Sequence, residues 1–567
     1  MKKTTKLLSL AFVLAMLVGC GAQPADASKE QGESAQPSQQ QSQGGESQGQ
    51  SQGGGQASSE AQAEDPEGFT FNDAELNTPQ VIHTDDQNKY LNYTDQYYHI
   101  TSSFLSSCNA NGNSNVSAPK QVTINFKYGA PAGKTVKNFS LVFGQKQDLS
   151  DGYEVKGTTA KKFSFYNSFL GDNYFKVVAN FTDNTNEESD VKVFKVEDKA
   201  PRNLYAGNMP NVRDMGGRTT YAGGKIKQGL IYRGAGNKFD NRSSVDSECQ
   251  SILTQQLGIK TEINVANGTG NNLNFSGVKV ENCFMDYGAT PYSNLSRNAE
   301  RVRQVMSVLA DINNYPVFYH CRIGTDRTGI TGMMIGGLLG IPFNEVFQDY
   351  CFSNFAPIDG QRYANKESDP NGDDPAKYID EILKMPGKNF QEQAYNALLS
   401  IGCPAEQLNT IIDIMTEGQK AELPNSMKVG KGNDLTSTGS KSTASDFKNP
   451  DIYYPISSGK EVSYTATLTA GEKDIIIYLG STDSSKSTKL ADGISLKIDG
   501  TAQTIVDKTL FLAGFGKTQQ NSRTGYMFNI LGKFTLTAGE HTITIAGKNS
   551  TTFNVATIGV FDHVVAA

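Results

Sequence analysis

One stretch of this 567-residue chain brings together a cysteine, an arginine and glycines at a spacing that suits phosphoryl transfer. Its residues are His320, Cys321, Arg322, Ile323, Gly324, Thr325, Asp326, Arg327, Thr328 and Gly329. The stretch lies between two apolar runs, 317–319 and 330–339, which predict a strand, a tight loop and a helix in that order. Because the first N–H groups of a helix have no intrahelical partner and the helix dipole is positive there, such a loop favours an anion.

Four residues of this loop suit that chemistry. Gly324 lets the loop bend so that its N–H groups point inward, and Arg327 offers a planar fork for two phosphate oxygens. The same field favours the thiolate form of Cys321, to which Thr328 would hydrogen-bond. Cys321 would attack phosphorus to form a phosphocysteine, which water then hydrolyses. Arg327 and the backbone amides would stabilise the phosphoryl oxygens, so this chemistry needs no metal ion or other cofactor.

The stretch resembles the Cys-x5-Arg signature of protein tyrosine phosphatases. Its form is most similar to the atypical bacterial tyrosine and phosphoinositide phosphatases. The segments 211–217, 229–234 and 349–354 resemble further motifs of that subfamily, so the resemblance spans about residues 203–420. It implies that His320 orients the loop and tunes the thiolate. The residues it implies for substrate binding are Arg322, Ile323, Gly324, Thr325 and Gly329.

The chain departs from the subfamily at two places. Thr325 stands where phosphoinositide-directed relatives often carry Lys, which weakens the case for a lipid head group. Residues 262–266 stand where relatives often have Ile-Asp-Leu-Arg, so we expect an acidic and a basic partner of the site to be missing. We expect Arg213 and Asp214 to serve the scaffold rather than the chemistry, because buried ion pairs commonly hold such loops.

The general acid that protonates the leaving group has two candidates. The resemblance points to Asp326, inside the loop; the alternative for this residue is a side chain that braces the loop or pairs with Arg213. Asp286 precedes Cys321 at a spacing similar to that of the mobile acid loop of conventional tyrosine phosphatases. Its alternative is a turn-forming role, which is common for Asp near Gly.

The first 20 residues predict export. A basic start and a short apolar run end in Leu17-Val18-Gly19-Cys20, which resembles a bacterial lipobox. That resemblance implies lipid chains on Cys20 and a membrane-anchored lipoprotein outside the cytoplasm; the alternative is an ordinary secretory signal. Residues 21–65 are rich in Ser, Gln and Gly, and they predict a flexible tether.

The rest of the chain predicts a multidomain protein with a central α/β domain and two β-sandwich-like flanks. Short alternating runs over 69–198 predict a first sandwich of the immunoglobulin or fibronectin type III kind. Strand-like and helical runs alternate over 201–423, and β-rich alternation returns over 434–567. The last segment is similar in its turn spacing to carbohydrate-binding modules, so it is either a glycan-binding domain or a spacer.

Composition narrows the partners. The net charge of −7 without a basic block argues against nucleic acid, and the five histidines show no metal-ligand spacing. The leading hypothesis is an exported phosphatase acting on phosphotyrosine, with phosphoinositides or inositol phosphates as alternative substrates. A sulfurtransferase and a surface adhesin with an inactive phosphatase core are the hypotheses from other classes.

Overall fold

The computed structural model describes most of the chain beyond residue 66. Its described residues are 67–113, 118–239, 244–285, 295, 298–363, 382–383, 385–423, 428–443, 452–481, 490–506 and 526–563. The predicted signal peptide, Cys20, the tether over 21–65 and Asp286 lie outside these residues. None of the helices described here is long and apolar enough to cross a membrane.

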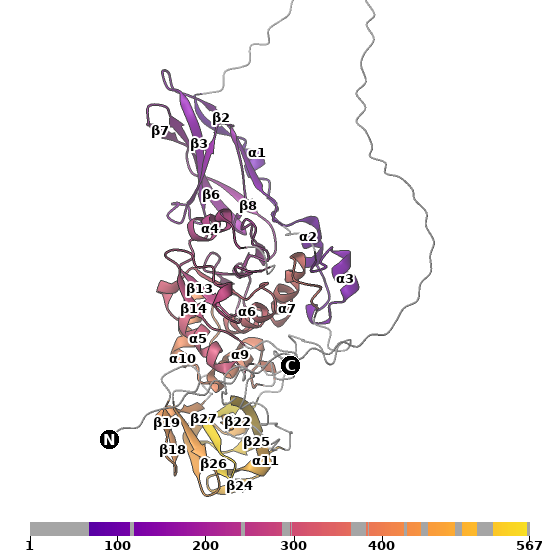
Figure 1. The fold of residues 1–567 in the computed structure, drawn as a ribbon, viewed down its shortest axis with the longest axis vertical. Helices are drawn as coiled ribbons and strands as arrows, with labels where there is room; N and C mark the ends of the chain where they lie inside the picture. The colour runs from indigo at the N-terminus through magenta and orange to yellow at the C-terminus, as the bar shows by residue number, and fades with distance from the viewer. Residues whose placement is uncertain are drawn as a thin grey trace, which may run out of the picture. The chain divides into compact units, whose positions relative to one another are not determined.

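The first β-rich region consists of two sheets that share one core (Figure 1). One sheet has the order β1-β2-β5, and the other has the order β4-β3-β6-β7 with β8 paired to β6. The strands are β1 (Gly68–Phe71), β2 (Val122–Gly129), β3 (Val136–Gly144), β4 (Tyr153–Thr158), β5 (Lys162–Phe165), β6 (Gly171–Phe181), β7 (Asn186–Glu188) and β8 (Lys192–Val196). Strand β2 alternates buried and exposed side chains, as expected for a sheet with one covered face.

A helical insertion interrupts this first region between the paired strands β1 and β2. Its elements are α1 (Asp73–Leu76), α2 (Asp85–Leu91), η1 (Tyr97–His99) and α3 (Ser102–Ser107). The β-like runs on which the 69–198 sandwich was predicted did not reveal these helices. The signal was nevertheless present, because Thr84 and Gln87 form a capping box at the start of α2.

The central region is an α/β domain around a six-stranded sheet of order β14-β13-β15-β12-β10-β9. Its strands are β9 (Arg202–Asn203), β10 (Arg213–Asp214), β12 (Ile231–Gly234), β13 (Thr261–Asn264), β14 (Lys279–Asn282) and β15 (Val317–His320), and a separate pair is β11 (Lys225–Ile226) with β16 (Thr416–Glu417). Its helices are α4 (Ser247–Ser251), the π-turn η2 (Ile252–Gln256), η3 (Thr269–Asn271), α5 (Ala299–Leu309), η4 (Ile312–Asn314), α6 (Asp326–Leu339), α7 (Phe343–Phe352), η5 (Ser353–Phe355), α9 (Phe390–Ser400) and α10 (Ala405–Met415). Strand β15 is buried at every position, as the apolar run predicted.

The C-terminal region is a second pair of packed sheets with its own core. The orders are β19-β20-β27-β22-β25, with β17 on β27, and β18-β21-β26-β23-β24. The elements are β17 (Lys428–Lys431), η6 (Gly432–Asp434), β18 (Leu435–Ser437), β19 (Ser442–Thr443), β20 (Ile452–Ile456), β21 (Glu461–Leu468), β22 (Gly471–Ser481), α11 (Leu490–Gly493), β23 (Ile494–Ile498), β24 (Thr501–Gln503), β25 (Tyr526–Leu536), β26 (Gly539–Gly547) and β27 (Phe553–Asp562). The predicted fold class, a central α/β domain with two β-rich flanks, is confirmed.

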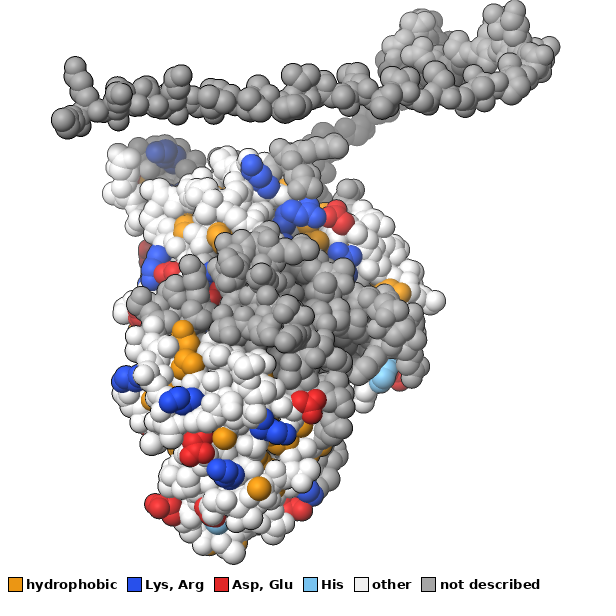
Figure 2. Space-filling view, turned by 60° about the horizontal axis from the view of Figure 1, so that its bottom comes forward, with side chains coloured by type: hydrophobic (Ala, Val, Ile, Leu, Met, Phe, Trp, Pro, Cys, Tyr) orange, Lys and Arg blue, Asp and Glu red, His pale blue; other side chains and the backbone are white. Residues whose placement is uncertain are grey.

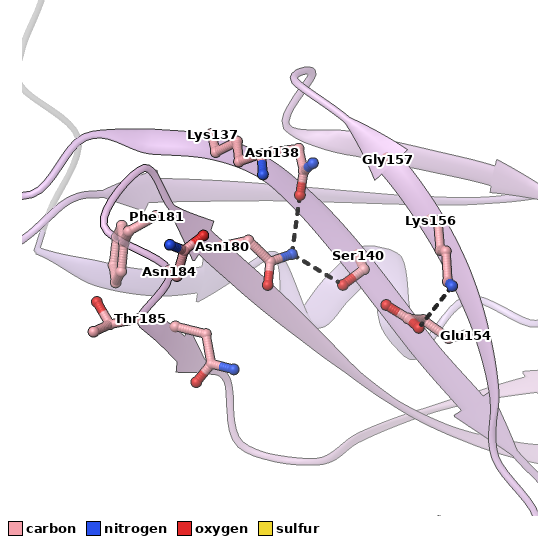
Figure 3. Close-up of a pocket in the computed structure, with 11 residues that line it drawn as sticks. Lys137, Asn138, Ser140, Glu154, Lys156, Gly157, Asn180, Phe181, Asn184 and Thr185 are labelled. Carbon is pink, nitrogen blue, oxygen red and sulfur yellow. Dashed lines mark hydrogen bonds and ion pairs between the residues drawn. The ribbon is translucent and has the colours of Figure 1, made fainter.

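Charged side chains of both signs are interspersed over the described surface drawn in Figure 2. A polar groove of about 320 Å³ lies on the first β-rich region (Figure 3). There Asn180 donates to Asn138 at 3.0 Å and to Ser140 at 3.2 Å, and Lys156 lies 3.9 Å from Glu154. The groove is lined by strands β3, β4 and β6 and by residues 184–186, which lead into β7, and it contains no residue of the cysteine stretch.

Candidate active site

The cysteine stretch lies at the centre of the parallel part of the sheet. Strand β15 pairs in parallel with β12 on one side and with β13 on the other. In this register Gly234 and Asn264 both stand opposite His320. The segments that follow the three strands therefore leave the sheet at the same edge, which is where open α/β sheets place their ligands.

Residues 321–325 form the cysteine loop, and groups outside this loop donate hydrogen bonds to its backbone carbonyl oxygens. The carbonyl oxygens of residues 321 to 324 accept, in chain order, from His320 Nδ1 (2.9 Å), Gly236 N (2.9 Å), Asn211 Nδ2 (3.1 Å) and Arg233 Nη2 (2.9 Å). Within the described chain, the amides of residues 322–325 donate to no other residue. With the carbonyls tied outward, successive N–H groups are left to bind an anion.

Gly324 makes this loop shape possible. Its φ of +74° lies in the left-handed region, and a Cβ built there would lie 2.4 Å from Gly234 O. Any other residue would be strained and would also collide with the neighbouring strand end. This confirms the bend predicted for Gly324.

The predicted nucleophile and its neighbours surround this loop. Cys321 is 2% exposed, at the end of β15. Arg327 lies in the first turn of α6, with its Nε and Nη1 atoms buried. The Thr328 hydroxyl is buried without a hydrogen-bond partner among the described residues. Since an unpaired buried hydroxyl costs free energy, it is suited to a thiolate or a bound oxyanion.

Two predicted substrate-binding residues, Ile323 and Thr325, have side chains that are already engaged in contacts within the protein. The Ile323 side chain packs with Ala356 and Ile358. Thr325 is fully buried, and its hydroxyl accepts a hydrogen bond from Asn211 at 3.1 Å. What Ile323 and Thr325 offer to an anion is therefore confined to their backbone amides.

Gly329 and Arg322 also make contacts within the protein that account for their presence without a bound substrate. A Cβ on Gly329 would lie 2.5 Å from the ring of Tyr350, so this glycine permits close helix packing. The Arg322 guanidinium donates to Phe239 O at 3.0 Å and pairs with Asp359 at 2.5 Å. Arg322 thus lies at the edge of the site with its charge balanced.

Behind the loop, His320 has an acidic partner that we expected to be missing. Its Nε2 lies 2.8 Å from Glu262 Oε1, and both side chains are fully buried. Glu262 also accepts the amide of Leu273 at 3.0 Å. The expectation was wrong because the acidic residue stands at a different position of the segment 262–266, and the parallel register brings Glu262 against His320 from the neighbouring strand.

Asp326, the candidate general acid, is paired at the front of the loop. Its Oδ1 accepts from Arg362 Nε at 3.0 Å and from the Tyr350 hydroxyl at 3.3 Å. The alternative pairing with Arg213 is not seen, because Arg213 binds Asp349 at 3.0 Å. Asp286, the other candidate, cannot be compared, since it lies outside the described residues.

A buried ion-pair cluster supports the loop from below. Asp349 meets Arg213, Arg233 and Arg218, and Arg202 pairs with Asp214 at 2.7 Å. Burial by itself would raise the pKa of Asp349, but the three guanidinium groups outweigh it and hold that pKa well below its usual range. Arg213 and Asp214 are therefore scaffold residues, as expected, and Arg233 links the cluster directly to Gly324 O.

Four residues that shape the site had no role predicted from the sequence: Asn211, Arg233, Glu262 and Arg362. Asn211 and Arg233 were inside segments with a family resemblance, so a signal for them existed. Arg362 carried no such signal, since it lies 36 positions after Asp326 in an irregular segment. No cluster of three His, Cys, Asp or Glu residues suited to a metal ion occurs among the residues described.

The candidate site lies in a region of the chain that is similar to a known family. A family model described as the tyrosine phosphatase family matches residues 205–417. No curated protein matches the chain. Among solved structures, the core catalytic domain of a PP-IP phosphatase from S. cerevisiae is 20% identical and has a TM-score of 0.19. The match covers 27% of this chain and 88% of the yeast one.

Two other solved structures are carbohydrate-binding modules. One is a family 35 module from Clostridium thermocellum, which is 15% identical and has a TM-score of 0.19. The match covers 24% of this chain and 98% of that module. The other, from a xylanase of the Trinervitermes trinervoides hindgut metagenome, is 15% identical, with a TM-score of 0.18, and covers 24% and 99%. The region that matches the tyrosine phosphatase family, residues 205–417, contains the whole cysteine loop, and the chain is an enzyme of the phosphatase type.

Proposed function

We propose that this phosphatase hydrolyses phosphotyrosine through a phosphocysteine intermediate. The observation that carries the proposal is the cysteine loop, whose carbonyls are tied outward while its amides are left for an anion beside Cys321. A phosphate held there would be gripped by the amides and by Arg327. The phosphorus atom of that phosphate would then lie within reach of the Cys321 sulfur at the start of the loop.

The reaction has two steps. The Cys321 thiolate attacks phosphorus, the bond from phosphorus to the phenolic oxygen breaks, and the general acid protonates the leaving phenolate. A water then attacks the phosphocysteine, which releases phosphate and restores the thiolate. His320, held between Glu262 and the Cys321 carbonyl, keeps the start of the loop in place.

Asp326 and Asp286 both remain candidates for the general acid. Both described contacts of Asp326 fall on Oδ1, so Oδ2 is the atom through which it would meet a leaving group. A general acid has to reach the proton acceptor within hydrogen-bond distance. The two candidates are therefore separated by mutation.

The charges around the loop favour a substrate with a single phosphate. The half-exposed Arg322 is balanced by Asp359, and Arg362 is balanced by Asp326. Polyphosphorylated inositols would need a surplus of positive charge at the rim. Thr325, where a Lys would supply it, is buried against Asn211. Phosphotyrosine is thus preferred over phosphoinositides or inositol phosphates.

The test is hydrolysis of p-nitrophenyl phosphate by the full chain between pH 4 and 8 with reduced thiols. Cys321→Ser is expected to lose activity by at least about 1000-fold. Asn at the true general acid, Asp326 or Asp286, is expected to cost about 100-fold or more. A folded wild type without activity on this ester, a phosphotyrosyl peptide or inositol hexakisphosphate would overturn the proposal and bring the adhesin hypothesis forward.

A matched control uses a second buried thiol. Burial raises the pKa of the Cys249 thiol in α4 to about 12, so it is unsuited to nucleophilic attack. Cys249→Ser makes the same atomic change outside the cysteine loop and should keep the wild-type rate. Equal losses in the two Ser variants would show that a general loss of folding, rather than the nucleophile, is responsible.

We also propose that the enzyme acts outside the cytoplasm as a lipoprotein attached through Cys20, on the strength of the first 20 residues alone. In a bacterial host the full chain should fractionate with membranes and label with a fatty acid. Cys20→Ala should abolish the label. Unlabelled wild-type protein would argue for an ordinary secretory signal instead.

A further inference from the structure

The helical insertion between β1 and β2 packs on the phosphatase domain as well as on the sandwich that it interrupts. Buried side chains of its helices, Tyr90, Tyr97 and Leu105 among them, belong to the same core cluster as β15 and α6. The Tyr90 hydroxyl donates to Gln348 O at 2.8 Å, and the Gln348 amide donates to the Tyr97 hydroxyl at 3.0 Å. The part of the helical insertion that spans residues 85–113 is thus joined to helix α7.

The end of the insertion is bonded to an irregular segment, residues 356–362, which we call the rim loop. Gly112 O accepts the amides of Ile358 at 2.8 Å and Gly360 at 3.2 Å. The side-chain amide of Gln361 donates to Ala110 O at 2.9 Å. The rim loop has no regular secondary structure, so these bonds take the place of the backbone hydrogen bonds that a helix or strand would form.

Gly112 is required at this junction by its own geometry. Its φ is +67°, and a Cβ there would lie 2.4 Å from Gly360 O and 2.6 Å from the carbonyl carbon of the same residue. The collision would be with backbone, which cannot rotate away. A side chain at position 112 would therefore move the rim loop.

The rim loop in turn touches the cysteine loop and the first residue of α6 through three side chains. Asp359 pairs with Arg322 at 2.5 Å, Ile358 packs with Ile323, and Arg362 Nε donates to Asp326 Oδ1 at 3.0 Å. Arg362 is itself fixed, because its backbone N–H and carbonyl both bond the Asn354 side chain at 2.6 Å. Gly112 N completes the junction by donating to Asn354 O at 2.9 Å.

We propose that the insertion positions the phosphatase site by way of the rim loop, and that Arg362 is the positioning residue for Asp326. This inference rests on the function proposed above. It means that the site depends on residues upstream of the region that matches the phosphatase family, 205–417. A displacement at Gly112 is transmitted to both Arg322 and Asp326, since one short loop carries both of their partners.

The first experiment compares Gly112→Ala with Gly133→Ala in the full chain. Gly133 also has a positive φ, +78°, but a Cβ there meets nothing within 4 Å. Both variants suffer the same backbone strain, and only the first displaces the rim loop. We expect Gly112→Ala to lower kcat on p-nitrophenyl phosphate by about 10- to 100-fold with a small change in KM. Equal kinetics for the two variants would overturn the proposal.

A measurement independent of catalysis separates this inference from the proposed function. Hydrogen exchange of peptides spanning 321–326 and 354–363 should quicken in Gly112→Ala and stay unchanged in Gly133→Ala. If the wild type is inactive on every ester, the proposed function fails, and the exchange result still decides the inference. Unchanged exchange in both peptides would overturn it.

The second experiment tests Arg362 through rescue and coupling. Arg362→Gln should lower kcat by about 10-fold or more, since a misplaced group at the reacting centre is costly, and Arg362→Lys should recover part of it. In a double variant with Gly112→Ala the losses should be less than additive, because both changes release the same carboxylate. Additive losses, or a Lys variant as poor as Gln, would contradict a positioning role.

Discussion

Two sets of ion pairs flank the cysteine loop, and they differ in exposure. Behind the loop, Asp349 is 7% exposed and its partners Arg213 and Arg233 are at most 1% exposed. At the rim, Arg322 is 29% exposed and its partner Asp359 is 66% exposed. The chemistry of the groups is the same, but the solvent around them is different.

The difference teaches which pairs hold the domain together and which adjust the site. A buried charge that loses its partner keeps its full desolvation cost, whereas water replaces the partner of an exposed one. We therefore expect changes behind the loop to alter stability most, and changes at the rim to alter activity and selectivity. The following variants test this contrast, from the largest expected effect to the smallest.

Asp349→Asn should be the most destabilising change. Removing one member of a buried pair costs about 3–5 kcal/mol, and here three arginines each lose an ion-pair partner. Because the pKa of Asp349 is lowered in the folded state, its contribution is present above the unfolded value of about 3.9 and is lost as the pH falls below it. Urea unfolding at pH 7 and at pH 3 measures this, and the variant should differ less from wild type at pH 3.

The control for this variant is Asp413→Asn. Asp413 pairs with Lys420 at 2.5 Å, but the carboxylate is 66% exposed. This change should leave the unfolding midpoint nearly unchanged. A similar shift in both variants would remove the distinction between buried and exposed pairs.

Glu262 should have an intermediate effect that depends on the replacement. His320 Nδ1 lies beside the Cys321 carbonyl oxygen, which can only accept a hydrogen bond, so Nδ1 is the donor. The hydrogen-bond partner of His320 Nε2 is Glu262. Glu262→Leu leaves Nε2 and the Leu273 amide unpaired and should cost about 1–3 kcal/mol. Glu262→Gln keeps hydrogen-bonding atoms at both places and should retain more stability and more activity. Thermal unfolding and kcat together measure the difference; a Leu variant as stable and active as Gln would contradict this account.

Asp359→Asn should have the smallest effect on stability, less than about 1 kcal/mol, because the pair is at the surface. Its effect should appear in selectivity. The unbalanced charge of Arg322 should raise kcat/KM on inositol hexakisphosphate relative to a phosphotyrosyl peptide, and salt should suppress the gain.

Asp183→Asn removes the same charge from an exposed pair with Lys134 on the first β-rich region, and serves as the control for Asp359. It should leave the ratio of the two substrates unchanged. An equal change in both variants would indicate a general effect of net charge. No change in either would show that the Arg322–Asp359 pair has no part in selectivity.

The two β-rich regions show where prediction from sequence stopped. In the first region the side chains of β2 alternate between buried and exposed positions, in agreement with the alternation of apolar and polar residues. In the C-terminal region β27 is buried at nine successive positions, although it contains Asn554 and Thr557. The cause is a second covered face: Tyr478 and Phe561 join the core cluster of the phosphatase domain, and the Thr557 hydroxyl donates to Ser400 O at 2.8 Å in α9.

What the sequence determined by itself is the local part of the site. The buried strand, the glycine bend and the helix start follow one another within about twenty residues, so local backbone preferences and one apolar pattern were enough to predict them. The match of residues 205–417 to the tyrosine phosphatase family agrees with that prediction.

Only the tertiary structure decided which charges face the loop. Glu262 lies 58 positions from His320, and Arg213 lies 136 positions from Asp349. Their meeting depends on strand register and on the packing of α7, neither of which is encoded in a local pattern. Electrostatic interactions act through space, so a residue such as Arg362 acquires its partner from the fold and not from its neighbours in sequence.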